Sequence, residues 1–168
     1  MDDQNTCMKN FSIELKWAIN FSIATLLWMI LEKSVGLHDK NIEHYLLYSS
    51  FFGVVAIVLY FFAMLDKKKN YFKGSMTWRE GFTSGIILSF IIALLCPLVQ
   101  YVIFTYITPH FFENFIALAV SKKSSTPEQA AAYFNLKSYV LQSIFGALSM
   151  GVITSALVAL IIKTKKPN

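Results

Sequence analysis

The residues best suited to chemistry in this chain are its three histidines. His38 and His44 each have an acidic neighbour in sequence, and His110 stands three residues before Glu113. Imidazole and carboxylate groups are common ligands of transition metals, which makes these four residues weak candidates for a metal site. No pair among them has the spacing of an established metal motif, and titrating histidines in solvated loops are the simpler interpretation. We therefore expect no metal, no cofactor and no catalytic residue.

Three amide side chains stand inside otherwise apolar stretches: Asn20, Gln100 and Gln142. They could line a small polar cavity, or they could form hydrogen bonds between neighbouring helices. The uncharged cores of these stretches contain no Asp, Glu, Lys, Arg or His, whereas proton-coupled transporters and ion pathways usually have such a residue. The pattern therefore argues against a pump. The chain also lacks the P-loop, HExxH, GxSxG and CxxC motifs.

Small residues recur at intervals of four in two of the apolar stretches. They are Gly81 and Gly85 in one, and Ser143, Ala147, Gly151, Ser155 and Ala159 in the other. Small residues at this spacing form a groove in which a second helix can approach closely. The partner helix could belong to the same molecule or to a second copy, so the pattern predicts helix packing and leaves a homodimer open.

Four apolar stretches dominate the chain and must position these residues. Hydrophobic residues make up 55% of the 168 residues, and the mean hydropathy is +0.51. Soluble domains usually have about 45–50% apolar residues, so the excess indicates a membrane protein. A helix of about 20 apolar residues spans a bilayer. The sequence thus predicts an all-α integral membrane four-helix bundle, in one domain, with spans at about 13–34, 45–65, 82–107 and 139–162.

The first and third spans have distinctive features. The uncharged part of the first, Trp17–Leu31, has 15 residues, and its length of about 22 Å is less than the hydrocarbon thickness of about 30 Å. This helix must therefore extend, and we expect Glu14 and Lys16 to lie near the membrane interface. Pro97 interrupts the third span and predicts a kink near Ala93–Pro97.

A helical outer segment is predicted between the third and fourth spans, at about residues 110–138. Its pattern fits an interfacial amphipathic helix or an extension of the third span. The segment breaks at Lys122–Ser125, and a helix restarts with Thr126 at the N-cap and Pro127 in the first turn. A continuous helix from Pro127 into the fourth span is one interpretation.

A cationic loop, which begins at Asp66, joins the second and third spans and ends at a capping box formed by Thr77 and Glu80. With four spans, this loop and both termini lie on one side of the membrane. That side has ten basic residues, and the other side has five. They are Lys9, Lys16, Lys67, Lys68, Lys69, Lys73, Arg79, Lys163, Lys165 and Lys166 on the first side, and Lys33, Lys40, Lys122, Lys123 and Lys137 on the second.

This bias predicts a bacterial inner-membrane protein with both termini in the cytoplasm. The net charge of +5 is concentrated at the ends of the spans, where anionic lipid head groups lie, so we expect the lipid bilayer and not nucleic acid as the partner. A disulfide between Cys7 and Cys96 is not expected, because the two residues should lie at different depths.

Three segments carry a resemblance to a known family. They are residues 74–85 (GSMTWREGFTSG), residues 104–109 (FTYITP) and residues 125–129 (STPEQ). The chain resembles a family of small four-span bacterial membrane proteins, common in Bacteroidetes, that is known only as a domain of unknown function. The resemblance covers about residues 12–163 and implies an inner-membrane location, but it implies no catalytic residue. Lys122 and Lys123 depart from the more acidic outer segment of the family.

The preferred interpretation is a non-enzymatic structural or accessory membrane protein that associates with itself or with another membrane protein. A transporter or channel for a small neutral or apolar solute is the first alternative, with Pro97 at its gate and Gln100 and Gln142 near its path. The second alternative is a sensor or enzyme that binds a metal through the outer histidines.

Overall fold

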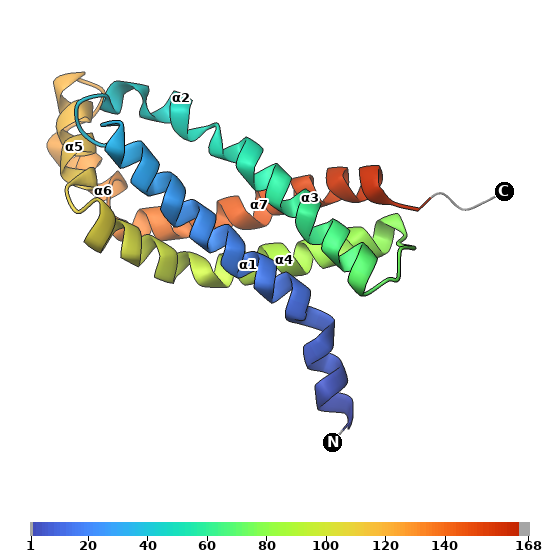
Figure 1. The fold of residues 1–168 in the computed structure, drawn as a ribbon. Coiled ribbons are helices and arrows are strands. Elements are labelled where there is room, and N and C mark those ends of the chain that lie inside the picture. Colours follow the sequence, from blue (N-terminus) through green and yellow to red (C-terminus); the bar gives the residue numbers. More distant parts are fainter. Residues whose placement is uncertain (1, 165–168) are drawn as a thin grey trace.

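Helices form all the regular structure in the part of the chain that the computed structural model describes, residues 2–164, with side chains from residue 11 onward (Figure 1). In order they are α1 (Asp2–Ser34), the 3-10 turn η1 (Ile42–His44), α2 (Tyr45–Ser49), α3 (Phe52–Asn70), α4 (Trp78–Val102), the π-helical turn η2 (Ile103–Ile107), α5 (Phe111–Ser121), α6 (Pro127–Tyr133) and α7 (Leu136–Ile162).

Four helical segments are long and apolar enough to cross a membrane: Phe11–Ser34, Ile42–Asn70, Trp78–Ile107 and Leu136–Ile162. The predicted all-α fold with four membrane-length helices is therefore confirmed, and the chain has the form of a multi-pass membrane protein. Predictions that involve the side chains of Cys7 and Lys9, or Lys165 and Lys166, concern parts of the chain outside the described residues.

The second span differs from its predicted limits of 45–65. It consists of two helices, α2 and α3, which a turn at Ser50 and Phe51 separates. Helix α3 continues to Asn70, so Lys67, Lys68 and Lys69 lie in its last turn and not in a loop. Cationic side chains at the carboxyl end of a helix are stabilised by its dipole. The prediction of a loop beginning at Asp66 was wrong, because these lysines can extend the helix and need not end it.

The third span begins with the predicted capping box. The Glu80 backbone N–H donates to Thr77 Oγ1 at 3.3 Å, and the Thr77 backbone N–H donates to Glu80 Oε2 at 2.7 Å. These bonds satisfy donors that the first turn of a helix leaves unpaired, so α4 starts at Trp78, as the predicted cap at Thr77 implies and four residues before the predicted apolar span at 82–107. Pro97 lies inside α4, which continues past it to Val102 and then into η2.

Two separate helices form the segment between the third and fourth spans. Residues 108–110 divide α5 from η2, so α5 is not an extension of the third span. Helix α6 begins with the predicted N-cap at Thr126, which forms a capping box with Gln129, and Pro127 lies in its first turn. It ends at Tyr133, because Asn135 has an extended backbone and its side chain accepts a hydrogen bond from the Ser138 N–H at 3.0 Å. Helix α7 therefore begins anew at Leu136, and a continuous helix from Pro127 into the fourth span is excluded.

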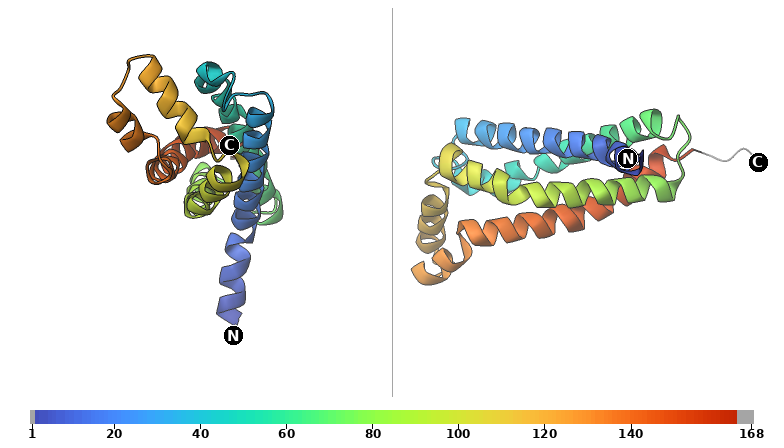
Figure 2. Two further views of the ribbon diagram at one scale, coloured as in Figure 1. Left: turned by 90° about the vertical axis from the view of Figure 1, so that its left-hand side faces the viewer. Right: turned by 90° about the horizontal axis from the view of Figure 1, so that it is seen from below.

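Helices α4 and α7 pack side by side, and α1 and α3 pack against them (Figure 2). Glycines allow the close approach of α4 and α7. A Cβ atom on Gly81 would lie 3.1 Å from the Cβ of Ala159. A Cβ on Gly85 would overlap the side chain of Ser155, and a Cβ on Gly151 would overlap the side chain of Ser89. Five residues of the two small-residue patterns, Gly81, Gly85, Gly151, Ser155 and Ala159, thus face one another within a single molecule.

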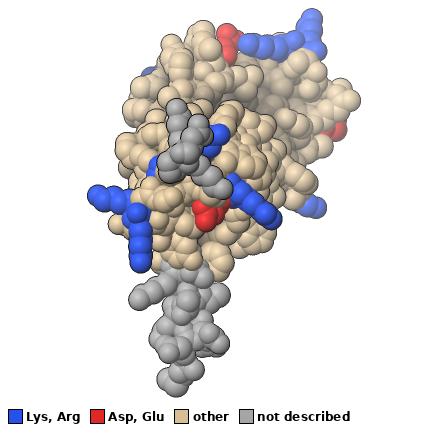
Figure 3. Space-filling view, turned by 90° about the vertical axis from the view of Figure 1, so that its right-hand side faces the viewer, with Lys and Arg blue, Asp and Glu red and all other residues tan. Residues whose placement is uncertain are grey.

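The two ends of the bundle differ in character. At one end, here called the lysine-rich end, the α3–α4 connection lies near the last turn of α7. Lysine and arginine side chains project at several places on this face of the molecule (Figure 3). At the other end, here called the α5–α6 end, aromatic rings pack together under α5 and α6. Phe104, Phe111 and Phe115 form the buried centre of this cluster, and Tyr139 of α7 packs against it.

Candidate functional site

A cavity of about 410 Å³ lies between the four membrane-length helices. Each of α1, α3, α4 and α7 contributes to its wall, and the wall is mainly apolar. The apolar lining includes Phe21 of α1, Phe52 of α3, Ile92 of α4 and Met150 of α7. An apolar space of this size between helices is typical of sites that bind small molecules.

A second cavity of about 270 Å³ adjoins the first toward the α5–α6 end. Thr25, Gln100 and Ser143 line both cavities, so polar side chains gather where the two meet. The Gln100 side-chain amide donates a hydrogen bond to the Ser143 hydroxyl and thereby connects α4 to α7. The larger cavity has a mainly apolar wall, and hydrogen-bonding side chains gather at its junction with the smaller cavity.

The structure brings together two of the three amides that were predicted to share a polar cavity. Gln100 and Gln142 both line the smaller cavity. The Gln142 side-chain oxygen also accepts a bond from the Tyr133 hydroxyl at 3.4 Å. Asn20 lies on α1, is half-buried, and lines neither of these two cavities.

Four small residues leave room in the larger cavity. Gly53 on α3 and Gly146 on α7 line it, and no heavy atom lies within 4 Å of a Cβ atom built on either glycine. Ser143 and Ala147, the remaining members of the α7 small-residue pattern, line the same space. Along α7, the first small residues of the pattern therefore line the cavity, and the later ones contact α4.

A buried ion pair lies at the lysine-rich end. Lys67 Nζ lies 2.9 Å from Glu14 Oε1, with the two side chains 6% and 3% exposed. The Ser84 hydroxyl donates a second hydrogen bond to Glu14 at 2.7 Å. Glu14 thus joins α1 to α3 and α4. The expectation that Glu14 lies near the interface missed this burial, which depends on residues far away in sequence.

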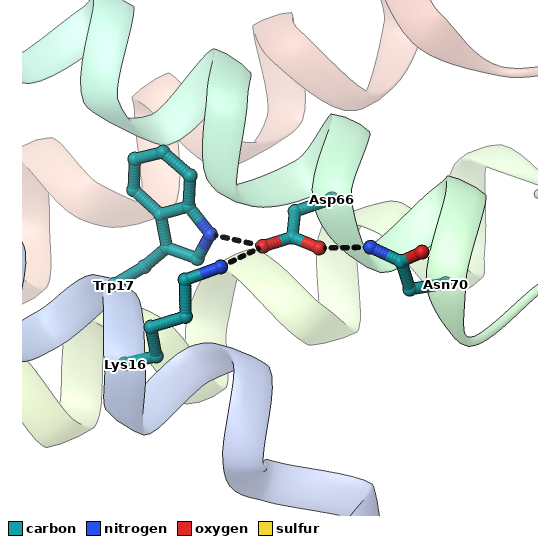
Figure 4. A network of polar contacts seen from close by, with 4 residues as sticks. All are labelled: Lys16, Trp17, Asp66 and Asn70. Carbon is teal, nitrogen blue, oxygen red and sulfur yellow. Dashed lines mark hydrogen bonds and ion pairs between the residues drawn. The ribbon is translucent and has the colours of Figure 1, made fainter.

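A more exposed polar network lies beside this ion pair (Figure 4). Asp66 Oδ2 accepts hydrogen bonds from Lys16 Nζ at 2.7 Å and from Trp17 Nε1 at 2.8 Å, and Asn70 donates to Asp66 Oδ1 at 2.5 Å. The Lys16 side chain is 60% exposed. Both polar groups hold the start of the apolar part of α1 against the end of α3.

A second buried carboxylate lies at the α5–α6 end. Glu32 Oε1 accepts a bond from Trp28 Nε1 at 2.6 Å, and Glu32 Oε2 lies 3.3 Å from His38 Nε2. Both Glu32 and His38 are nearly inaccessible to solvent. Of the four weak metal candidates, His38 is therefore buried with Glu32, whereas His44 is exposed and His110 forms an exposed pair with Glu113 at 2.9 Å.

These candidates do not converge. Among residues 11–164, the structure has no group of three or more His, Cys, Asp or Glu side chains that could hold a metal ion. The predicted outer histidines are thus distributed over separate contacts.

The spacing of the two buried carboxylates along α1 is a sequence signal for their burial. Glu14 and Glu32 are 18 residues apart, which is five turns of an α-helix, so both lie on the same face of α1. Their separation along the helix axis is about 27 Å, close to the thickness of a hydrocarbon core of about 30 Å. Both can therefore face the bundle while each stays near one edge of the membrane.

Comparison with known proteins places the chain in a family but provides no function. The family model for proteins of unknown function named DUF4199 matches residues 16–164, which is most of the chain. No curated protein and no solved structure matches the chain. The match agrees with the resemblance to a domain of unknown function. The chain therefore belongs to the DUF4199 family of proteins of unknown function.

Proposed function

We propose that this protein is a non-enzymatic protein of the bacterial inner membrane that binds a small, uncharged, mostly apolar molecule between its helices. The cavity among α1, α3, α4 and α7 is the observation that supports this proposal. Such binding is the step that transport of a neutral or apolar solute would require. The proposal favours that alternative over a purely structural or accessory role.

The chemistry of the cavity wall defines the ligand. Its surface is mainly apolar, and among residues 11–164 no Asp, Glu, Lys, Arg or His lines either of the two adjoining cavities. A charged ligand would lose its hydration without gaining an ionic partner, which is unfavourable by several kcal/mol or more. Gln100, Ser143 and Thr25 offer hydrogen bonds to one neutral polar group at the junction. An elongated molecule with an apolar body and one such group fits both parts of the space.

The orientation in the membrane is part of the same proposal. The ten basic residues assigned to one side support placing both termini, and with them the lysine-rich end, in the cytoplasm. The smaller cavity and the α5–α6 end then face the outside. Cysteines introduced in the 71–74 turn should react with a membrane-impermeant maleimide only after the cells are broken, and reaction in intact cells would contradict this orientation.

Filling the cavity tests the binding proposal. Gly53→Leu and Gly146→Leu would each place a side chain in space that holds no atom within 4 Å of the new Cβ. Ser149→Leu is the matched control, because Ser149 is an exposed residue of α7 that does not line the cavity. The probe is 3-trifluoromethyl-3-phenyldiazirine, a small apolar photolabel, applied to membranes that contain the protein.

We expect the half-buried cavity residue Cys96 to be labelled in the wild type. Labelling should fall severalfold in both glycine variants and should not change in Ser149→Leu. Equal labelling of the cavity residues in all four proteins would contradict the proposal. Thermal unfolding in mild detergent would show that each variant is folded.

A further inference from the structure

The larger interhelical cavity opens on one side of the bundle. Among residues 11–164, three of the residues that line it are exposed, and the other lining residues are buried or half-buried. The exposed three are Gly53 and Ile57 of α3 and Met150 of α7. The lining residues that α1 and α4 contribute are all buried or half-buried. The mouth of the cavity therefore lies between α3 and α7.

The surroundings of the glycines explain why α3 and α7 leave this opening. A Cβ atom on Gly151 would lie 2.8 Å from the Tyr60 hydroxyl, so the two helices touch there. Toward the α5–α6 end they separate (Figure 1), and a Cβ atom on Gly146 or Gly53 would meet no heavy atom within 4 Å. Tyr60 and Gly151 thus close the mouth toward the lysine-rich end, and the helices stay apart beyond them.

The position of the mouth along the helices determines the medium into which it opens. Ile57 and Met150 each stand one residue beyond the midpoint of their membrane-length segments, Ile42–Asn70 and Leu136–Ile162. The two residues are 52% and 61% exposed. At this depth a membrane-spanning helix is surrounded by the hydrocarbon chains of the lipid. A ligand that enters through this mouth therefore comes from the bilayer and not from water.

Hydrogen-bonding groups inside the cavity select the polar end of such a ligand. The Gln100 side-chain amide donates to the Ser143 hydroxyl oxygen. In addition to this bond, the amide oxygen of Gln100 can accept a hydrogen bond and the hydroxyl group of Ser143 can donate one. A hydroxyl group on the ligand both donates and accepts, so it can pair with both side chains.

We propose that the cavity binds a single-chain lipid with a terminal hydroxyl group, which enters sideways from the bilayer between α3 and α7. The hydroxyl group bonds to Gln100 and Ser143, and the far end of the chain remains in the bilayer through the mouth at Ile57 and Met150. This inference rests on the proposed function, because it names the ligand and the entrance of the same cavity. A phospholipid is disfavoured, since its charged head group would lose its hydration on the way to the mouth.

Competition by alcohols of different chain length tests the open mouth. Hexanol, dodecanol or octadecanol is added, at equal mole fraction in the bilayer, to membranes that contain the protein. The measured quantity is the labelling of Cys96 by 3-trifluoromethyl-3-phenyldiazirine, which a bound alcohol should exclude. A closed cavity rejects a chain longer than itself, whereas an open mouth lets the excess chain remain in lipid. We therefore expect all three alcohols to reduce the labelling to a similar extent.

The outcomes separate this inference from the proposed function. Competition by hexanol without competition by octadecanol would overturn the inference and leave the cavity as a binding site. Absence of Cys96 labelling before any alcohol is added would contradict the proposed function itself, and the inference with it.

Dodecane tests the polar end of the ligand, because it has the chain of dodecanol without the hydroxyl group. We expect dodecanol to compete severalfold better than dodecane in the wild type, and this advantage should be lost in Gln100→Leu. Equal competition by the two compounds in the wild type would overturn the assignment of a hydroxyl group.

Tryptophan substitutions locate the mouth. Ile57→Trp and Met150→Trp should narrow it, so octadecanol should compete severalfold less in each variant while hexanol still competes. Val54→Trp is the matched control, because Val54 is 61% exposed on the same helix as Ile57 and does not line the cavity. The control should retain competition by both alcohols. Competition by octadecanol that survives in both variants, or that falls equally in Val54→Trp, would overturn the entrance between α3 and α7.

Discussion

Removal of the cation from the buried ion pair should destabilise the bundle strongly. In Lys67→Met the Glu14 carboxylate stays buried, with Ser84 as its remaining described donor. Loss of one partner of a buried ion pair costs about 3–5 kcal/mol, because the other charge is left without compensation. We therefore expect the free energy of unfolding to fall by about 3 kcal/mol or more, as measured by titration with sodium dodecyl sulfate in mild detergent.

The matched control is the more exposed pair at the same end. Lys16 and Asp66 lie 2.7 Å apart, with side chains 60% and 12% exposed, and Asp66 keeps the donors Trp17 and Asn70 when Lys16 is replaced. Exposed ion pairs contribute about 0.2–1 kcal/mol, so Lys16→Met should cost less than about 1 kcal/mol. The two variants remove the same group from pairs with similar geometry, and they differ mainly in burial.

A double-mutant cycle completes the test. The double variant Glu14→Gln/Lys67→Met should lose about 1–3 kcal/mol less unfolding free energy than the sum of the two single variants. The reason is that Glu14→Gln removes the carboxylate charge that Lys67→Met leaves without a partner. If Lys67→Met costs no more than Lys16→Met, or if the two changes at Glu14 and Lys67 are additive, the reasoning from burial is refuted.

Three further predictions follow from helix contacts and caps. Gly85→Ala should destabilise the protein by about 1–3 kcal/mol, because its Cβ would overlap the Ser155 side chain, whereas Gly146→Ala should be tolerated because its Cβ meets no atom within 4 Å. Thr77→Ala should cost about 1 kcal/mol by removing the cap of α4. Asn135→Ala should cost a similar amount and increase hydrogen exchange in the first turn of α7, since its side chain caps that helix. Unfolding titrations measure all three, and unchanged stability in Gly85→Ala would contradict the close approach of α4 and α7.

Local sequence determined the helices and several of their ends. Four apolar stretches of membrane length require four helices, because backbone groups in lipid must pair within their own segment. The capping box at Thr77 and the N-cap at Thr126 were also predictable, because each bond in them joins residues three apart. The start of α7 at Leu136 was missed although Asn135 caps it, because a cap is hard to distinguish from an ordinary polar residue when helical sequence lies on both sides.

Only the tertiary structure decided what the polar side chains do. Glu14 meets Lys67 across 53 positions, and Gln100 meets Ser143 across 43, so no local pattern specifies either contact. The cavity likewise depends on how four helices pack, since Gly146 faces open space while Gly151, five residues later, touches α4. Amino-acid composition determines whether a helix lies in lipid or in water, because the free energy of transfer into lipid depends on residue type. The partner that each side chain meets depends on the relative positions of distant helices, and these are set by the packing of the whole bundle.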